Sequence, residues 1–133
     1  MSGETSLTLM LSSLAPSLLP GEFVYCTCPD ADYGDYAELS PLASFREAEG
    51  LSLVLPREQA DSAHRSYQGV FRCISLALHS SLESVGLTAA ISQRLASRGI
   101  SANVIAACFH DHILVPAALA RDAMAALEFT GED

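Results

Sequence analysis

The sequence has no lysine, and arginine supplies all seven of its basic residues against sixteen acidic ones. With a formal net charge of −9, little positive charge is present to neutralise phosphates, which excludes a general nucleic-acid-binding surface. Charged residues of either sign are also scarce, at 17% of the chain, while half of the residues are hydrophobic. This imbalance predicts an apolar face covered by another subunit, so we expect a homodimer or a larger assembly.

The sequence also lacks the continuous apolar run of about 20 residues that a membrane span requires. The apolar N-terminal stretch, residues 7–19, follows Glu4 without a positively charged segment and is interrupted by Pro16. It therefore lacks the features of a secretion signal. We expect a protein that does not associate with membranes.

Only four cysteines are present, and each stands inside an apolar, strand-like run: Cys26, Cys28, Cys73 and Cys108. Cys26 and Cys28 would lie on the same face of a strand, because side chains alternate between faces. Such regular placement is untypical of a secreted disulfide framework. The sequence predicts reduced thiols and a cytoplasmic protein.

The hydrophobic pattern predicts strands at residues 7–11, 23–28, 51–55, 70–78, 103–109 and 113–115. Helices are expected at residues 56–64, at 85–98 and from Pro116 onward. The strand at 70–78 is apolar on both faces, which predicts a central position. Residues 29–44 are rich in proline, glycine and acidic side chains, and are expected to form one long loop.

Two segments repeat a pattern. LVLPREQADSA from Leu53 and ILVPAALARDA from Ile113 each give three apolar strand residues, a proline and an alanine-containing amphipathic helix. A proline is tolerated at the first helical position because the missing N–H has no partner there. Each half is therefore expected to contain part of a β-α-β-β-α unit, which is the ferredoxin-like pattern of an α+β fold.

A polar loop follows the strand at 70–78 and leads into the helix at 85–98. Unpaired N–H groups and the helix dipole would favour a small zwitterion or anion at this position. Gly86 would let the chain turn and would leave room for a ligand carboxylate, whereas Ser84 fits a helix-capping role. His79, Ser80 and Ser81 do not form a nucleophile with its base, because neighbouring strand residues face opposite sides and no GxSxG motif is present. The sequence predicts no catalytic residues.

The alternative is a metal-binding protein that uses His110 and His112, which would share one face with Cys108. We expect these histidines in a hairpin turn, where Asp111 bonds the backbone, and zinc would need further ligands from elsewhere. We therefore favour a polar turn, or ligand contact, over a metal. The acidic loop at residues 30–38 could bind a cation, but it lacks the order of an EF-hand, and a solvated loop is the simpler interpretation.

Three separated segments agree in order and spacing with a known family: residues 43–56 (ASFREAEGLSLVLP), 73–89 (CISLALHSSLESVGLTA) and 103–116 (NVIAACFHDHILVP). On these segments the chain resembles a small prokaryotic family of paired ACT domains. That family is in turn similar to the amino-acid-sensing ACT pairs of the eukaryotic cytosolic arginine sensors. Residues 80–86 match the ligand loop of an ACT domain, with Gly86 as its glycine.

The resemblance implies two ferredoxin-like ACT halves in tandem, a mainly antiparallel sheet with helices on one face. The division would give a degenerate half at residues 1–69 and a second half at 70–133. It further implies a regulatory protein that binds a small molecule, since ACT units usually bind amino acids or other small metabolites, and we expect an amino acid here. We expect no cofactor and no metal. The expected ligand contacts are Glu49, Gly50, Ser80, Ser81, Leu82, Val85, Gly86, Leu87, Thr88, Asn103, His110 and His112.

Overall fold

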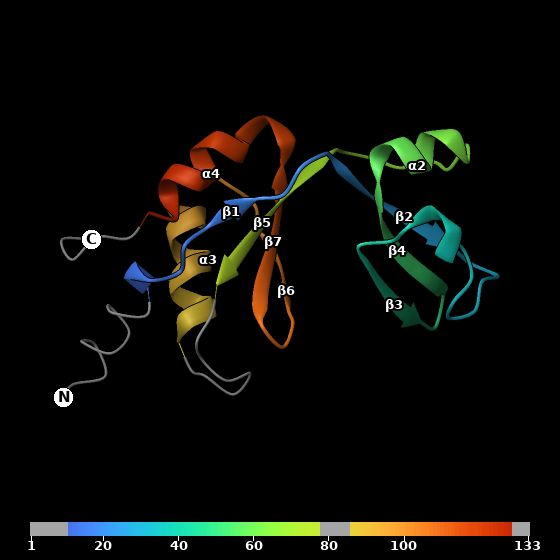
Figure 1. Cartoon of the computed structure of the whole chain (residues 1–133), viewed down its shortest axis with the longest axis horizontal. Helices are drawn as coiled ribbons and strands as arrows, with labels where there is room; N and C mark the ends of the chain where they lie inside the picture. Colours follow the sequence, from blue (N-terminus) through green and yellow to red (C-terminus); the bar gives the residue numbers. More distant parts are fainter. Residues whose placement is uncertain (1–10, 78–85, 129–133) are drawn as a thin grey trace. The chain divides into compact units, whose positions relative to one another are not determined.

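The computed structural model describes residues 11–77 and 86–128, which divide into two compact units (Figure 1). One unit is the continuous segment Pro20–Phe71. The other joins the N-terminal segment, up to Leu19, to the chain from Arg72 onward. The predicted division after residue 69 lies next to the Phe71–Arg72 junction, but the N-terminal segment groups with the later unit.

The unit Pro20–Phe71 contains strands β2 (Phe23–Cys28), β3 (Ala43–Glu47) and β4 (Gly50–Pro56), which pair antiparallel in the order β3-β4-β2. The 3-10 helix η1 (Ala37–Leu39) follows β2, and helix α2 (Arg57–Ser62) follows β4. Because side chains alternate along each strand, β2 and β4 each present one apolar row to α2 and η1. These residues form the core: Val24, Cys26, Cys28, Leu39, Leu51, Leu53, Leu55 and Ala60.

The other unit contains strands β1 (Ser17–Leu18), β5 (Phe71–Ala77), β6 (Asn103–Ala106) and β7 (His110–Pro116), in the order β1-β5-β7-β6. Helix α3 (Leu87–Ser97) connects β5 to β6, while the 3-10 helix η2 (Ala117–Leu119) and helix α4 (Ala120–Ala126) follow β7. Strand β5 has neighbours on both sides, which confirms its predicted central position. Its buried Ile74 and Leu76 pack in one cluster with α3 and α4.

Helix α3 forms where the spacing of apolar residues predicts it. Leu87, Ile91 and Leu95 recur every four residues, and all three are buried against the sheet. The helix begins after Gly86 and ends before Gly99, and both glycines have positive φ angles, of 94° and 72°. Positive φ is readily reached only by glycine, so these residues fix both ends of the helix.

The two predicted strand-proline-helix segments have the same local geometry. Pro56 has φ −55° and ψ 133°, and Pro116 has φ −53° and ψ 134°. Each proline ends a strand, β4 or β7, and leads directly into helical turns. The repeat in the sequence therefore corresponds to a repeated backbone junction, and each unit places its helices on one face of a mainly antiparallel sheet.

Three details of the predicted secondary structure are wrong. The loop expected over residues 29–44 ends at β3, an edge strand in which four of five residues are exposed and hydrophobic alternation is therefore missing. Residue Leu11 lies in a helical turn rather than a strand, and a short strand forms at β1 instead. His110, Asp111 and His112 belong to strand β7, and the hairpin turn is formed by residues 107–109.

Across the described ranges, none of the helices combines the length and the apolar character needed to cross a membrane.

Candidate functional site

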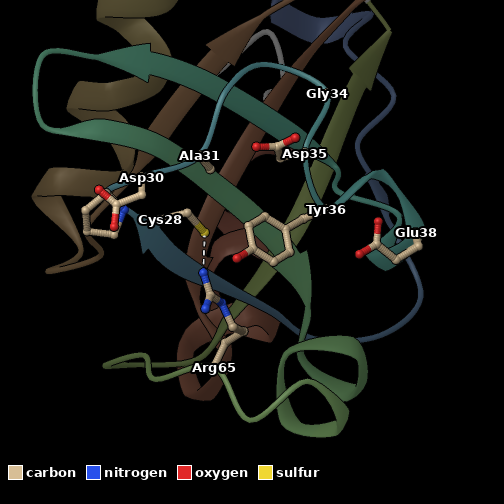
Figure 2. Close-up of a pocket in the computed structure, with 9 residues that line it drawn as sticks. Cys28, Asp30, Ala31, Gly34, Asp35, Tyr36, Glu38 and Arg65 are labelled. Carbon is tan, nitrogen blue, oxygen red and sulfur yellow. Dashed lines mark hydrogen bonds between the residues drawn. The ribbon is translucent and has the colours of Figure 1, made fainter.

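A hollow of about 550 Å³ lies at the carboxyl end of β2, within the unit Pro20–Phe71 (Figure 2). We call it the β2 hollow. The loop after β2 supplies most of its lining, and the segment after α2 supplies Arg65. Its lining residues are Cys28, Pro29, Asp30, Ala31, Gly34, Asp35, Tyr36, Glu38 and Arg65.

Arg65 is held at the edge of this hollow by three contacts. Its Nη2 donates a hydrogen bond to Sγ of Cys28 at 2.7 Å, and its guanidinium lies 4.6 Å from the centre of the Tyr36 ring. Its backbone N–H donates to the carbonyl oxygen of Ala60 in α2 at 2.9 Å. The hydrogen bond to Cys28 is the largest cause of the raised pKa of Arg65. The guanidinium is thus a fixed positive charge beside the β2 hollow.

The loop that forms the rest of the lining is shaped by its own polar groups. The N–H of Asp32 donates to Oδ2 of Asp35 at 2.8 Å, and the N–H of Asp35 donates to the carbonyl oxygen of Asp32. Tyr36 has a φ of 65°, which places it in the left-handed region that is unfavourable for a residue with a side chain. This backbone turns the Tyr36 ring toward Arg65, as Figure 2 shows.

The charges around the β2 hollow are of both signs. Asp30, Asp35 and Glu38 contribute carboxylates and are exposed, whereas Arg65 contributes the single guanidinium among the lining residues. A guanidinium can pair with a carboxylate in a forked geometry, and carboxylates can accept hydrogen bonds from an ammonium group. The β2 hollow can therefore accommodate a zwitterion chemically.

A second hollow of about 390 Å³ shares Gly34 and Asp35 with the first. Its remaining lining is largely apolar and includes Leu42, Leu51 and Leu53. The loop after β2 thus borders both a charged hollow and a mainly apolar one.

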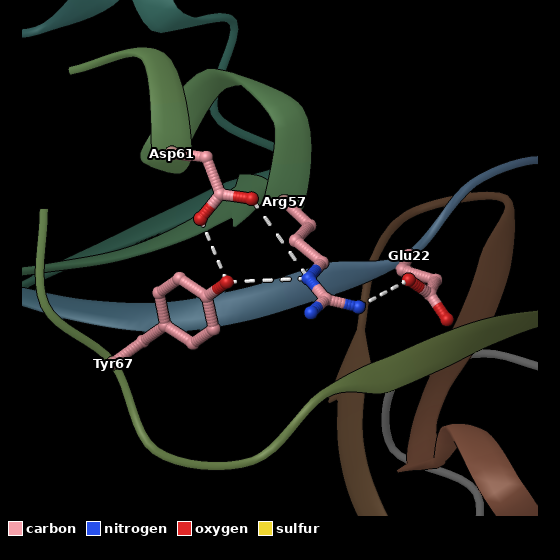
Figure 3. Close-up of polar contacts among 4 residues, drawn as sticks. All are labelled: Glu22, Arg57, Asp61 and Tyr67. Carbon is pink, nitrogen blue, oxygen red and sulfur yellow. Dashed lines mark hydrogen bonds and ion pairs between the residues drawn. The ribbon is translucent and has the colours of Figure 1, made fainter. Parts of the chain in front are cut away.

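A polar network fixes the segment that carries Arg65 (Figure 3). Arg57, the first residue of α2, donates through Nη1 to Glu22 at 2.9 Å and through Nε to the hydroxyl of Tyr67 at 3.2 Å. The Tyr67 hydroxyl donates in turn to Oδ1 of Asp61 at 2.7 Å. The bond to Glu22 is the main cause of the raised pKa of Arg57. Residues 63–67 are thereby tied back to α2 and to the start of β2.

Of the ligand contacts expected from the sequence, Ser80, Ser81, Leu82 and Val85 lie outside the described residues. Gly86 stands at the start of α3 with a φ of 94°, and among the described residues, its chain neighbours apart, a β-carbon built on it would meet no atom within 4 Å. Leu87 is buried in the core of its unit, while Thr88 is exposed. The ligand role expected for Gly86 stays a prediction.

Glu49 and Gly50 belong to the other unit, at the turn between β3 and β4. Glu49 is exposed. Gly50 packs against the backbone that borders the β2 hollow: a β-carbon there would lie 2.5 Å from Cα of Pro29 and 2.7 Å from the carbonyl oxygen of Cys28. Gly50 thus lets β4 approach this backbone closely, although it does not itself line the hollow.

Asn103, His110 and His112 lie on β6 and β7. Asn103 donates through Nδ2 to the carbonyl oxygen of Leu114 at 3.3 Å, and Nδ1 of His110 lies 3.2 Å from the carbonyl oxygen of Leu76. The rings of His110 and His112 are 6.2 Å apart, on the same face of β7 as predicted from their spacing. Cys108 lies in the turn and not on that strand.

Asp111, between the two histidines, is buried, with 4% of its surface exposed. Burial raises the pKa of its carboxyl group, and His112 has a smaller effect that lowers it. Asp111 therefore faces the core, which excludes the exposed turn position expected for it. Among the described residues, no group of three or more histidine, cysteine or acidic side chains is arranged to hold a metal ion.

Sequence reasoning noted the acidic loop but missed Arg65. The two are separated by β3, β4 and α2, and no local pattern links them. Only the pairing of β2 with β4, and the return of the chain after α2, bring Arg65 to Cys28.

Comparison with known families gives two matches to the ACT domain, over residues 2–72 and 69–128. A comparison with curated proteins found no match. Among solved structures, a Vibrio cholerae protein of unknown function, described as a possible transport protein, is 48% identical, with a TM-score of 0.86 over 95% of this chain and 96% of that one.

Two more distant structures share the fold. A protein from Agrobacterium tumefaciens is 16% identical, with a TM-score of 0.69 over 84% of each chain. The regulatory subunit of aspartate kinase from Thermus thermophilus is 11% identical, with a TM-score of 0.62 over 86% of this chain and 95% of that one. The resemblance of the sequence to paired ACT domains is confirmed.

Proposed function

The chain belongs to the ACT-domain family, and we propose that it is a non-catalytic regulatory protein that binds an amino acid. ACT domains are typical small-molecule regulatory modules. The observation that carries the proposal is the β2 hollow, which is lined by the fixed guanidinium of Arg65 and by three carboxylates. The α-carboxylate of an amino acid would pair with Arg65, and its ammonium group with Asp30, Asp35 or Glu38.

We propose a second ligand position at the loop before α3. The two proposed positions are equivalent in the order of elements. The β2 hollow lies after β2, before the chain reaches η1 and β3, and the second position lies after β5, before the chain reaches α3 and β6. None of the described residues would crowd a β-carbon on Gly86, at the start of an eleven-residue helix whose first N–H groups favour a carboxylate. Ser80, Ser81, Leu82, Val85, Leu87 and Thr88 remain part of this proposed position, with Asn103, His110 and His112 as proposed neighbours.

A thermal-shift screen of the purified full chain against the amino acids tests the proposal, because a ligand of the folded state raises the melting temperature. Calorimetry of any hit would then compare Arg65→Ala, Gly86→Val and a control, Arg98→Ala, at the end of α3. We expect Arg65→Ala to weaken binding at the β2 hollow at least about tenfold, as loss of one charged hydrogen bond does. Gly86→Val would weaken binding at the second position.

If no amino acid shifts the melting temperature, or if binding is the same in all three variants, the proposed function is wrong. Divalent metals are included in the screen because His110 and His112 carried the alternative interpretation. A metal that stabilises the protein, with the effect lost in His110→Ala/His112→Ala, would replace the amino-acid proposal.

We also propose that the protein acts in the cytoplasm as a homodimer or larger assembly. The unpaired state of all four cysteines and the low content of charged residues support these two statements. A regulatory domain without catalytic residues must pass its signal on through a partner or through its own assembly. Light scattering at micromolar concentration that detects only a 14.1 kDa species would contradict the assembly.

A further inference from the structure

The four cysteines have different surroundings, and Cys28 is the one that lines the β2 hollow. Although Cys28 is only 2% exposed, its Sγ accepts a hydrogen bond from the guanidinium of Arg65, 2.7 Å away. The same guanidinium lies over the ring of Tyr36, 4.6 Å from its centre. A thiolate, which is the attacking form of cysteine, would thus have a charged hydrogen-bond partner.

The other cysteines lack this combination of a hollow and a cation. Cys73 is fully buried, and burial raises its pKa to about 11. Cys26 is buried two residues before Cys28 on the same strand and does not line the hollow, and burial is the main cause of its raised pKa. Cys108 is exposed on the turn between β6 and β7 and is not one of the residues that line the β2 hollow. The reaction rate of Cys28 can therefore be compared with the rates of three other cysteines in the same chain.

We propose that Cys28 is a modification site, at which small, positively charged disulfides form a mixed disulfide inside the β2 hollow. In this exchange the Cys28 thiolate attacks one sulfur of the reagent, and a new S–S bond forms as the reagent's S–S bond breaks. The leaving thiolate takes the proton that Cys28 released. Cys28 is oxidised and the released half of the reagent is reduced, so no further oxidant is needed. The proposal shares the hollow with the proposed function but does not depend on an amino-acid ligand.

The expected preference for a positively charged reagent follows from the charges of the residues that line the β2 hollow. Asp30, Asp35 and Glu38 outnumber the single guanidinium of Arg65, so the β2 hollow concentrates cations relative to anions. The ammonium group of the reagent would lie among these carboxylates while its sulfur meets Cys28. No such selection applies at the exposed turn that carries Cys108.

The experiment treats the native full chain with cystamine, a cationic disulfide, and separately with 3,3′-dithiodipropionate, an anionic disulfide of similar size. Peptide mapping by mass spectrometry measures the rate at each cysteine. We expect Cys28 to react at least about tenfold faster with cystamine than with the anionic reagent, because local potential changes encounter rates by such factors. Cys108 should differ between the two reagents much less, and Cys73 should stay unmodified with both.

Two variants separate the role of the cation from loss of folding. Arg65→Gln should slow the cystamine reaction at Cys28 about tenfold, because the thiolate loses its partner. Arg65→Lys keeps a positive charge and should retain most of the rate, while circular dichroism checks that both variants are folded. Asp35→Asn should reduce the preference for cystamine over the anionic reagent.

The proposal is overturned if Cys28 in the native chain reacts no faster than Cys73, or if the two reagents modify it equally. These outcomes are independent of the thermal-shift screen, because they concern the chain without any amino acid. An amino acid that raises the melting temperature while Cys28 stays inert would support the proposed function and refute this inference.

Discussion

The two units build the same strand-proline-helix junction but cross over differently after their first long strand. In one unit, β5 leads through α3 to β6, and Leu87, Ile91 and Leu95 of α3 fill the space over the sheet. In the other, β2 leads to β3 through a loop that contains only the three-residue η1. A single buried side chain, Leu39, comes from η1.

This difference explains where the β2 hollow comes from. A helix of eleven residues presents a continuous apolar face, whereas a 3-10 helix of three residues cannot cover the same part of a sheet. The space that remains is bordered by polar loop residues and by Arg65. Where a loop replaces a packed helix, the fold thus has less core packing and an open hollow instead.

The largest loss of stability should come from shortening a buried side chain of α3, the helix that connects β5 to β6. We expect Ile91→Ala, at 1% exposure in α3, to lower the free energy of unfolding by about 2–5 kcal/mol, because it removes buried methyl groups and leaves a cavity. Leu39→Ala in η1 should cost clearly less, since its neighbours can close over the space. Urea denaturation of both variants measures the comparison, and equal losses would show that η1 is packed as tightly as α3.

A second, smaller loss of stability contrasts Gly50, which packs against the backbone bordering the β2 hollow, with Gly86 at the start of α3. Gly50→Ala should cost about 1–3 kcal/mol, because its β-carbon would overlap the backbone of Pro29 at 2.5 Å. Gly86→Ala has open space and carries only the strain of its positive φ, about 1 kcal/mol. Thermal unfolding of the two variants tests this order. A larger loss in Gly86→Ala would mean that the start of α3 is more crowded than the described residues show.

The smallest effect concerns pH and the buried carboxyl of Asp111. Burial raises its pKa, so the folded state holds this proton more tightly than the unfolded state does. The resulting stability is present at low pH and is lost as pH rises through the folded pKa, from about pH 4 upward. Asp111→Asn should therefore gain stability relative to the natural chain as pH rises from 4 to 7. Urea denaturation across this range measures the gain, with Asp30→Asn in the exposed loop as the charge-matched control.

The elements that the sequence predicts well are those with buried, periodic apolar residues. Helix α3 and strands β2, β4 and β5 are examples, because burial selects the residues that create the pattern. Strand β3 was missed because an edge strand with exposed side chains carries no such pattern. The turn between β6 and β7 was misplaced because polar residues suggested a turn where Asp111 is in fact buried.

The site was harder to predict than the fold. Acidic residues after β2 were visible in the sequence, but their meaning depends on Arg65, which reaches them only through sheet pairing and the network of Arg57 and Tyr67. Such tertiary contacts leave no periodicity in the sequence. The proposed position at Gly86 depends instead on the local sequence and the family resemblance, and it stays a prediction.

The short strand β1 sets the order in which a nascent chain can complete its structure. Ser17 and Leu18 pair with Ser75 and Ile74 of β5, so the whole segment Pro20–Phe71 leaves the ribosome before β1 meets its partner. Within that segment, Phe23 pairs with Phe71, which joins the two ends of the segment. Once this segment is folded, less flexible chain lies between β1 and β5. The entropic cost of bringing these two strands together is therefore lower. Co-translational folding of Pro20–Phe71 would therefore prepare the closure of the other unit.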